Sequence, residues 1–215
     1  LRNTSLSDFK KFIRGKDYVF AKQYNGEGGH GISKIKVSDI EDIDKLYEDL
    51  INNDQLLIEE EIKQCKEVNE INPNVVCSFR VITLYKGGEV YLLNNAFRIN
   101  QDDSNIIGCT NDLYFSMNEN GIIDSNVIDD YANVYTKHPL TGKLFKDVKI
   151  PGVKEAFDMC MEAHKKLPQV RYIGWDVAFS DKGPLLVEGN EYPGYGLVQF
   201  YKLKNKKTIF ILSII

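Results

Sequence analysis

A β-hairpin at residues 171–190 is the sequence feature that most constrains what this chain can fold into. Apolar residues stand along both of its strands, so both faces of the hairpin are expected to be covered by other elements. The strands flank a short loop of Asp181, Lys182 and Gly183. A three-residue loop with a glycine in the left-handed conformation sets the register of such a hairpin. The hairpin is therefore expected to lie within a larger, mostly buried antiparallel structure.

In that register Asp176 lies opposite Glu188, and Asn190 shares the face of Glu188 because side chains alternate along a strand. Asn190 neighbours Gly174, which has no side chain and is expected to leave a space. Two facing carboxylates repel each other and need a compensating cation. Mg²⁺ binds such oxygen ligands, so Asp176, Glu188 and Asn190 are candidate metal ligands. The alternative is a solvated hairpin with acidic residues on its wet face.

A glycine-rich loop is expected between two further strands, residues 18–22 and 32–37. Its glycines are Gly26, Gly28, Gly29 and Gly31. Glycines let backbone N–H groups turn inward and approach an anion closely. The loop joins strand to strand, which distinguishes it from phosphate loops that precede a helix. Lys22 ends the first strand and suits a phosphate contact; the alternative is a mobile hairpin tip.

Two arginines lie in a long central hairpin, in which residues 75–85 and 89–99 flank Lys86-Gly87-Gly88. A three-residue loop would pair Arg80 with Asn94 and place Arg98 on the same face as Arg80. A two-residue loop would put the arginines on opposite faces, because a one-residue shift reverses every side chain. The hydrophobic pattern is compatible with both registers. Surface arginines on an edge hairpin are the alternative to an anion site.

The remaining elements are short and of both kinds. The periodicity predicts a helix over 5–15 that Ser5 or Ser7 could cap, and a second helix that begins after Ser38 or Asp39. A strand in 55–62 runs into Glu59, Glu60 and Glu61. Further expected elements are short strands near 112–117 and 121–128, and a helix over 152–166. This order indicates an α+β fold with mainly antiparallel sheets.

The charge balance and the cysteines narrow the class of protein. With 27 basic and 31 acidic side chains the formal net charge is −4, so no bulk positive field is available to hold nucleic acid or an anionic membrane. Any phosphate site must be local. The four cysteines lack C-x-x-C spacing and are interpreted as free thiols of a reducing compartment. The apolar run that ends the chain is too short to span a bilayer. It is interpreted as a docking strand or helix end, with a membrane or partner contact as the alternative.

From residue 19 to residue 194 these features resemble the ATP-grasp superfamily, and most closely its sugar-transfer-associated branch. The resemblance is carried by Val19-Phe20-Ala21-Lys22 with Gly26 to Gly31, Leu57-Ile58-Glu59-Glu60-Glu61-Ile62, Ser78-Phe79-Arg80-Val81-Ile82-Thr83, Ile173-Gly174-Trp175-Asp176-Val177 and Leu186-Val187-Glu188-Gly189-Asn190-Glu191-Tyr192-Pro193-Gly194. The last stretch is the most specific. The resemblance implies an ATP-grasp fold with two lobes that hold the nucleotide between them.

The resemblance also implies roles for individual residues. Lys22 would contact ATP and the 26–31 loop would close over its phosphates. Glu59, Glu60, Glu61 and Ile62 would form the hinge that reads the adenine edge, with Glu67 as a ribose ligand. Asp176, Glu188 and Asn190 would hold Mg²⁺. Arg80 and Arg98 would face the γ-phosphate or an acyl phosphate, with Asn111 beside them on the substrate side.

The function implied is an ATP- and Mg²⁺-dependent carboxylate–amine ligase, which activates a carboxylate as an acyl phosphate and passes it to an amine. Its setting would be polysaccharide or peptide-like metabolite biosynthesis in the cytoplasm. The alternatives are a nucleotide-binding module or kinase-like phosphotransferase without ligase activity, and a β-rich interaction domain. The expected division is an N-terminal lobe at 1–62, a C-terminal lobe with the metal site at 63–201, and a basic and apolar tail at 202–215. Relatives usually carry a preceding α/β domain, and this sequence begins after the position of that domain.

Overall fold

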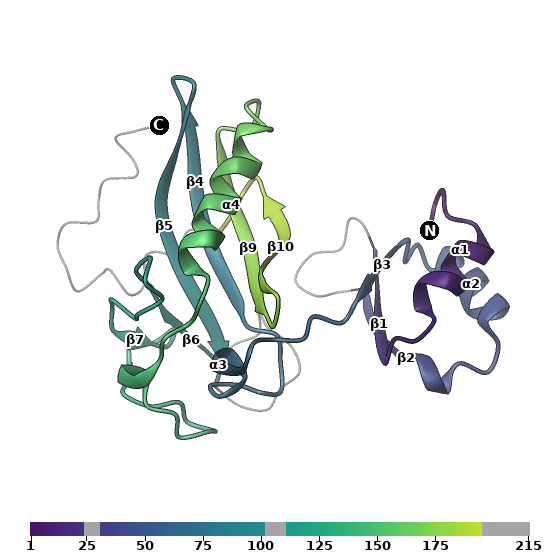
Figure 1. Cartoon of the computed structure of the whole chain (residues 1–215), viewed down its shortest axis with the longest axis horizontal. Coiled ribbons are helices and arrows are strands. Elements are labelled where there is room, and N and C mark those ends of the chain that lie inside the picture. Colours follow the sequence, from purple (N-terminus) through teal and green to yellow (C-terminus); the bar gives the residue numbers. More distant parts are fainter. Residues whose placement is uncertain (24–30, 102–110, 195–215) are drawn as a thin grey trace. The chain divides into compact units, whose positions relative to one another are not determined.

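The structure is a computed structural model of the 215-residue chain, and it describes residues 1–23, 31–101 and 111–194. The chain divides into two compact units, Leu1–Ile62 and Lys63–Ile215. Each unit has its own sheet, shown in Figure 1. The expected glycine loop, except Gly31, and the expected tail at 202–215 lie outside the described residues.

The first unit is a three-stranded antiparallel sheet with two helices. Its elements are α1 (Leu6–Ile13), β1 (Tyr18–Lys22), β2 (Ile32–Lys36), a 3₁₀ turn η1 (Val37–Asp39), α2 (Ile43–Asn52) and β3 (Leu57–Glu60). The strand order is β2-β1-β3, so β1 is central. Its alternate residues Val19 and Ala21 are fully buried with Phe9, Ile13 and Leu50. One face of the sheet therefore packs on the helices, as strand alternation requires.

The caps of the two helices explain where they begin. The Ser5 side chain accepts a hydrogen bond from the Asp8 amide, so the expected cap of α1 is confirmed. The second helix begins later than expected. Residues around Ser38 and Asp39 form the 3₁₀ turn, and Asp42 caps α2 by accepting from the amides of Asp44 and Lys45. A carboxylate that satisfies two amides of the first turn is the stronger start signal.

The second unit is a seven-stranded antiparallel sheet with the helix α4 along one face (Figure 1). Its elements are α3 (Lys66–Asn69), β4 (Ser78–Lys86), β5 (Glu89–Asn100), β6 (Asp112–Phe115), β7 (Val127–Ile128), β8 (Val134–Tyr135), η2 (Phe145–Asp147), α4 (Val153–Lys165), β9 (Tyr172–Ser180) and β10 (Gly183–Asn190). The strand order is β10-β9-β4-β5-β6-β7-β8. The expected α+β class with antiparallel sheets is confirmed.

The two faces of this sheet differ in composition. On one face the rings of Phe79, Phe97, Phe115 and Phe179 are fully or almost fully buried, and Phe79 also contacts Phe157 of α4. Ring centroids on this face lie 5.3 Å apart for Phe97 and Phe115. We call it the core face. The opposite face carries Ser78, Arg80, Asp176 and Arg98, and we call it the polar face.

The central hairpin has a two-residue turn rather than the three-residue loop that would pair Arg80 with Asn94. Lys86 pairs with Glu89 across Gly87 and Gly88, which both have positive φ. A bulge shifts the register between Thr83 and Ile82, so that Arg80 pairs with Ala96. The extra residue of a bulge reverses the side-chain alternation on one strand. Arg98 therefore lies on the same face as Arg80 even though the turn has two residues.

The last hairpin also has a two-residue turn and a bulge. Gly183 pairs with Ser180, so the turn contains Asp181 and Lys182, and the expected three-residue loop is wrong. A register shift between Leu186 and Glu188 then restores the expected pairing of Asp176 with Glu188 and of Asn190 with Gly174. The pairing was predicted correctly from an incorrect turn, because one bulge displaces the register by the same one residue as a longer loop.

The region from 111 to 150 contains less strand than expected. The predicted strand at 112–117 is present as β6, but 121–128 contributes only β7, and β8 and η2 were not expected. Among the cysteines, Cys65, Cys77 and Cys160 are free and buried, which agrees with the interpretation as thiols; Cys109 lies outside the described residues. In the part of the chain that the structure describes, no helix is both long and apolar enough to span a membrane.

Candidate functional site

Asp176 on β9 is the centre of a charged cluster on the polar face. Its strand partner on β4 is Arg80, whose Nε and Nη2 donate to Oδ1 and Oδ2 at 2.5 and 2.9 Å. The Ser78 hydroxyl donates to Oδ1 at 3.3 Å. The two charged side chains are only 12% and 16% exposed. This bidentate pair fixes the plane of the carboxylate and neutralises its charge.

Glu188 and Asn190 join Asp176 from the neighbouring strand β10. The Asn190 amide nitrogen lies 3.5 Å from Asp176 Oδ2 and 3.2 Å from Glu188 Oε1. The amide thus bridges two carboxylates that would otherwise repel each other across the strand pair. All three candidate metal ligands are brought together. Within the described ranges, no group of three or more His, Cys, Asp or Glu side chains is placed to hold a metal ion, and this set has two carboxylates and one amide.

The place above Gly174 is filled, which corrects the expectation of an empty space. A Cβ at Gly174 would lie 2.4 Å from Pro193 Cβ and 3.1 Å from Arg80 Cδ. Pro193 is buried and follows Asn190 by three residues. Because Gly174 has no side chain, Pro193 packs directly against its backbone, and the aliphatic part of the Arg80 side chain lies beside it.

Arg98 forms a second ion pair on the same face. Its Nε donates to Asp112 Oδ2 at 2.5 Å, and Asp112 is fully buried. Arg98 is the strand partner of Ser78, which binds Asp176, so the two ion pairs belong to neighbouring strands of one surface. Tyr114 pairs with Arg98 in register, and burial raises the pKa of its hydroxyl. The tyrosine therefore stays neutral beside the arginine.

Asn111 precedes β6 with a positive φ of 107°. Its side-chain oxygen accepts from Gln101 Nε2 at 3.1 Å, and its carbonyl accepts from the Gln101 amide at 3.1 Å. These contacts hold Asn111 next to the end of β5. It adjoins Asp112 in sequence, so it borders the Arg98 ion pair.

In the first unit each of the three consecutive glutamates forms an ion pair with a lysine. Lys22 lies 2.5 Å from Glu59 and Lys16 lies 2.7 Å from Glu60. A third pair joins Lys34 to Glu61 at 2.9 Å. Lys22 was predicted from the sequence, whereas Lys16 and Lys34 were missed. The available signal for Lys34 was its position opposite Phe20, on the same face as Lys22.

The other predicted residues of this unit are placed in part. Ile62 ends the unit after the glutamates. Gly31 has a φ of +75°, and a Cβ there would lie 2.7 Å from Gln23 Oε1, so the position requires a glycine. Gly26, Gly28 and Gly29 lie outside the described residues.

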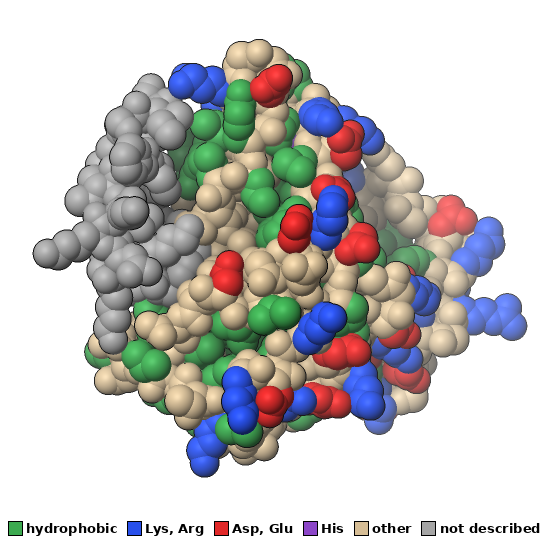
Figure 2. Space-filling view, turned by 60° about the vertical axis from the view of Figure 1, so that its left-hand side comes forward, with side chains coloured by type: hydrophobic (Ala, Val, Ile, Leu, Met, Phe, Trp, Pro, Cys, Tyr) green, Lys and Arg blue, Asp and Glu red, His purple; other side chains and the backbone are tan. Residues whose placement is uncertain are grey.

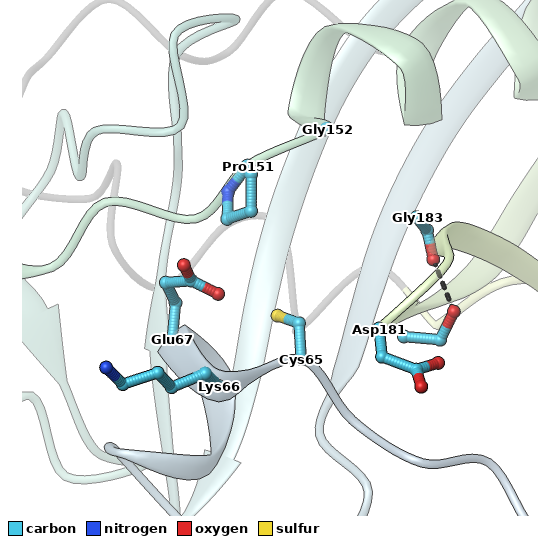
Figure 3. A pocket seen from close by; sticks show the side chains of 8 residues that line it. Cys65, Lys66, Glu67, Pro151, Gly152, Asp181 and Gly183 are labelled. Carbon is cyan, nitrogen blue, oxygen red and sulfur yellow. Dashed lines mark hydrogen bonds between the residues drawn. The ribbon is translucent and has the colours of Figure 1, made fainter.

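Glu67 lies apart from the charged cluster, in the wall of an open pocket of about 460 Å³ (Figure 3). The pocket is lined by Cys65, Lys66, Glu67, Pro151, Gly152, Ser180, Asp181 and Gly183. Asp181 stands five residues along the chain from Asp176, which corresponds to about 16 Å along a strand.

The nearby cysteine, Cys160 of α4, is buried in the core and is not suited to thiol chemistry. Burial raises the pKa of Cys160 to about 12, with the charge of Asp176 adding to the effect. A thiol so protonated is a poor nucleophile.

Figure 2 shows basic and acidic side chains interspersed over one face of the described residues. Among the described residues on this face, the view shows no extended basic patch that would bind an anion by charge alone.

Comparisons with known proteins place this geometry in a family. Residues 2–210 match the family described as "Sugar-transfer associated ATP-grasp". No curated protein matches the chain. Among solved structures, the biotin carboxylase domain of the Hydrogenobacter thermophilus 2-oxoglutarate carboxylase is similar with a TM-score of 0.52 and 15% identity, over 89% of this chain and 35% of that one. D-alanyl-alanine synthetase A from Vibrio cholerae is similar with a TM-score of 0.48 and 15% identity, over 96% and 52%.

The chain thus spans about a third to a half of the length of these solved proteins. The first of them has the same fold, and the family match extends over both units of this chain. The resemblance seen in the sequence is confirmed. The chain has an ATP-grasp fold and belongs to the sugar-transfer associated ATP-grasp family.

Proposed function

We propose that this chain is the nucleotide-binding part of an ATP- and Mg²⁺-dependent carboxylate–amine ligase that works through an acyl phosphate. The observation that carries the proposal is the polar face of the second unit. On this face lie two arginines and the set of Asp176, Glu188 and Asn190. Arg80 pairs with Asp176 of that set, and Arg98 pairs with Asp112. Phosphoryl transfer needs positioned cations more than a nucleophile.

The residues of this set fit Mg²⁺. Mg²⁺ is usually bound by one or two carboxylates together with substrate phosphates and waters. Asp176 and Glu188 supply the carboxylates. The Asn190 amide contacts both through its nitrogen, and a turn of the amide would present its oxygen to a metal instead. Asp176 Oδ2 accepts from Arg80 at 2.9 Å and from the Asn190 amide at only 3.5 Å, and a metal would take the place of this longer contact. When bound, the ion would neutralise charge on the phosphates of ATP.

In this proposal the first unit, together with Glu67 of the second unit, would supply the remaining nucleotide contacts. Lys22 would contact the nucleotide, and the pair with Glu59 holds its ammonium at the end of β1. The loop from 26 to 31 would cover the phosphates. Glu59, Glu60, Glu61 and Ile62 would form the hinge that reads the adenine edge, and Glu67 would bind the ribose. The Hydrogenobacter structure, solved with MgADP, supports ATP and Mg²⁺ as ligands of this fold.

The arginines would act on the substrates. Arg80 and Arg98 would face the γ-phosphate and the acyl phosphate, because guanidinium groups bind phosphate oxygens with two parallel hydrogen bonds. Asn111 would contact the substrate beside Arg98. The chain's part in catalysis is to hold both anions together and to offset their charge. The words on sugar transfer in the family description point toward polysaccharide synthesis as the setting. Synthesis of a peptide-like metabolite is the alternative, and the use of ATP favours the cytoplasm.

The test is ADP release from ATP and Mg²⁺ in the presence of panels of carboxylates, with hydroxylamine as the trap. A ligase should release ADP only when a carboxylate is present, and hydroxylamine should convert the acyl phosphate to a hydroxamate. Arg80→Lys should abolish both signals, while Lys36→Ala, which alters an exposed ion pair of β2, should leave them unchanged. ADP release that follows a hydroxyl acceptor and gives no hydroxamate would instead identify a kinase-like phosphotransferase.

A further inference from the structure

The carbonyl oxygen of Asn100, at the end of β5, accepts hydrogen bonds from two buried side chains. Asn72 Nδ2 lies 3.1 Å away and His138 Nε2 lies 2.8 Å away. Asn72, Asn100 and His138 are all 0% exposed. A carbonyl oxygen can only accept, so the His138 ring carries a hydrogen on Nε2. Neither side chain has a role in the proposed reaction so far.

Strand pairing ends where these side chains begin. β4 starts at Ser78, opposite Arg98, so its pairing with β5 ends two residues before Asn100. On the other side Asn100 pairs with Asp112 of β6. A buried carbonyl oxygen must be hydrogen-bonded. Asn72 and His138 supply donors at this point.

His138 is itself held in place by its own segment. Its amide donates to the Lys143 carbonyl at 2.8 Å, and its carbonyl accepts from the Gly142 amide at 2.9 Å. The Thr141 hydroxyl donates to the Ile71 carbonyl at 2.8 Å, next to Asn72 in the chain. The segment after β8, the segment after α3 and the end of β5 therefore meet at one carbonyl oxygen.

We propose that His138 and Asn72 are positioning residues that fix Arg98 for its contact with phosphate, an inference that rests on the proposed function. Arg98 lies two residues before Asn100 on the same strand, and its carboxylate partner Asp112 is the strand partner of Asn100. Holding the Asn100 carbonyl keeps the last pair of β5 and β6 together. The Arg98 guanidinium is then aimed by Asp112, although neither His138 nor Asn72 contacts it.

The first readout is the NMR signal of the Arg98 Nε–H, assigned by its loss in Arg98→Lys, because it reports the Arg98–Asp112 pair without any ligand. His138→Phe keeps the ring and removes the donor, whereas His138→Gln keeps a donor. The matched control is His164→Phe: His164 is also 0% exposed, and its Nε2 lies 2.8 Å from the Val170 carbonyl, away from Arg98. We expect the signal to shift to the position of a free arginine in His138→Phe alone.

The second readout is the preference for the γ-phosphate, measured as the ratio of Kd for MgADP to Kd for the Mg²⁺ complex of a non-hydrolysable ATP analogue. The ratio should fall by about tenfold in His138→Phe and return in His138→Gln. If His138→Phe does not fold, Asn72→Ala, which removes the other donor, should shift the same Arg98 signal.

An unchanged Arg98 signal in folded His138→Phe would overturn the positioning role whatever the nucleotide data show. A shifted signal with an unchanged Kd ratio would support the hold on Arg98 and overturn its contact with the γ-phosphate. A wild-type chain that binds neither nucleotide would contradict the proposed function, and the Arg98 signal would still decide the positioning role.

Discussion

The core face and the polar face of the seven-stranded sheet are built from the same strands but stabilised in different ways. On β4, Phe79 and Val81 are buried against other apolar side chains, while Ser78 and Arg80, which alternate with them, point to the opposite face. The core face depends on close packing of rings. The polar face depends on pairing charges that would be costly to bury alone. Changes to the two faces should therefore separate stability from ligand binding.

The largest effect on stability is expected from the core face. Phe97 is fully buried between the rings of Phe79, Phe115 and Phe179. Phe97→Ala should lower the free energy of unfolding by about 3–5 kcal/mol, because it leaves a cavity among these rings. Urea denaturation of the variant and of Phe12→Ala, a change at a ring that is 39% exposed, measures the difference. Equal losses in both variants would contradict the assignment of the core.

Gly174 links stability to the site. An added methyl group would meet Pro193 and Arg80 at distances too short for contact. Gly174→Ala should cost about 1–3 kcal/mol of stability and should weaken Mg²⁺-dependent nucleotide binding, because the Asn190 segment and Arg80 are displaced together. Gly194→Ala is the control, since a methyl group there meets no atom within 4 Å. Wild-type nucleotide binding in Gly174→Ala would show that the packing of Pro193 against Gly174 does not matter for the site.

Glu188→Gln should change binding with little change in stability. Glu188 is exposed, and the amide keeps its size while removing the charge that a metal needs. The melting temperature should stay close to that of the wild type, and Mg²⁺ should no longer tighten nucleotide binding. Glu162→Gln, on the exposed surface of α4, should retain the Mg²⁺ effect. If Glu188→Gln responds to Mg²⁺ like the wild type, the metal assignment is wrong.

The smallest effect concerns pH and His138. Burial lowers the pKa of its imidazole, and the hydrogen bond to Asn100 opposes this in part. A lowered pKa in the folded chain means that the neutral form contributes stability above the ordinary value of about 6.5. This contribution is lost as the pH falls through the folded pKa. The described contacts of the ring are the Asn100 carbonyl, the Thr141 amide and the Phe145 ring, none of which is charged.

Melting temperatures between pH 8 and pH 5 test this sign. The loss of stability toward pH 5 should be smaller in His138→Gln than in the wild type, because glutamine does not titrate. The ion pairs Glu70–Lys143 and Arg98–Asp112, on segments packed against His138, are the same in both proteins. Identical pH profiles would show that His138 is not the group responsible.

The sequence predicted most of what depends on local pattern. Strand alternation and glycine turns predicted both long hairpins and the pairing of Asp176 with Glu188. The helix α4 was also predicted. It could not predict the two bulges, because an extra residue in one strand leaves the hydrophobic pattern almost unchanged. The register of Arg80 and Arg98 was therefore left open, and the pairing of Arg80 with Ala96 came only from the structure.

Contacts between distant segments were the other limit. Pro193 fills the place above Gly174, and His138 reaches Asn100 from 38 residues away. Neither pair shares a local pattern, so nothing in the spacing indicates them. The lysine partner of Glu60 was missed for a similar reason, since Lys16 lies outside any strand.

The most direct test of the central claim is calorimetric titration of the whole chain with a non-hydrolysable ATP analogue, with and without Mg²⁺. The claim is that the polar face, with Asp176, Glu188 and Asn190, is a metal–nucleotide site. It predicts binding that Mg²⁺ tightens in the wild type and does not tighten in Glu188→Gln. Absence of binding, or equal affinity with and without Mg²⁺, would contradict it.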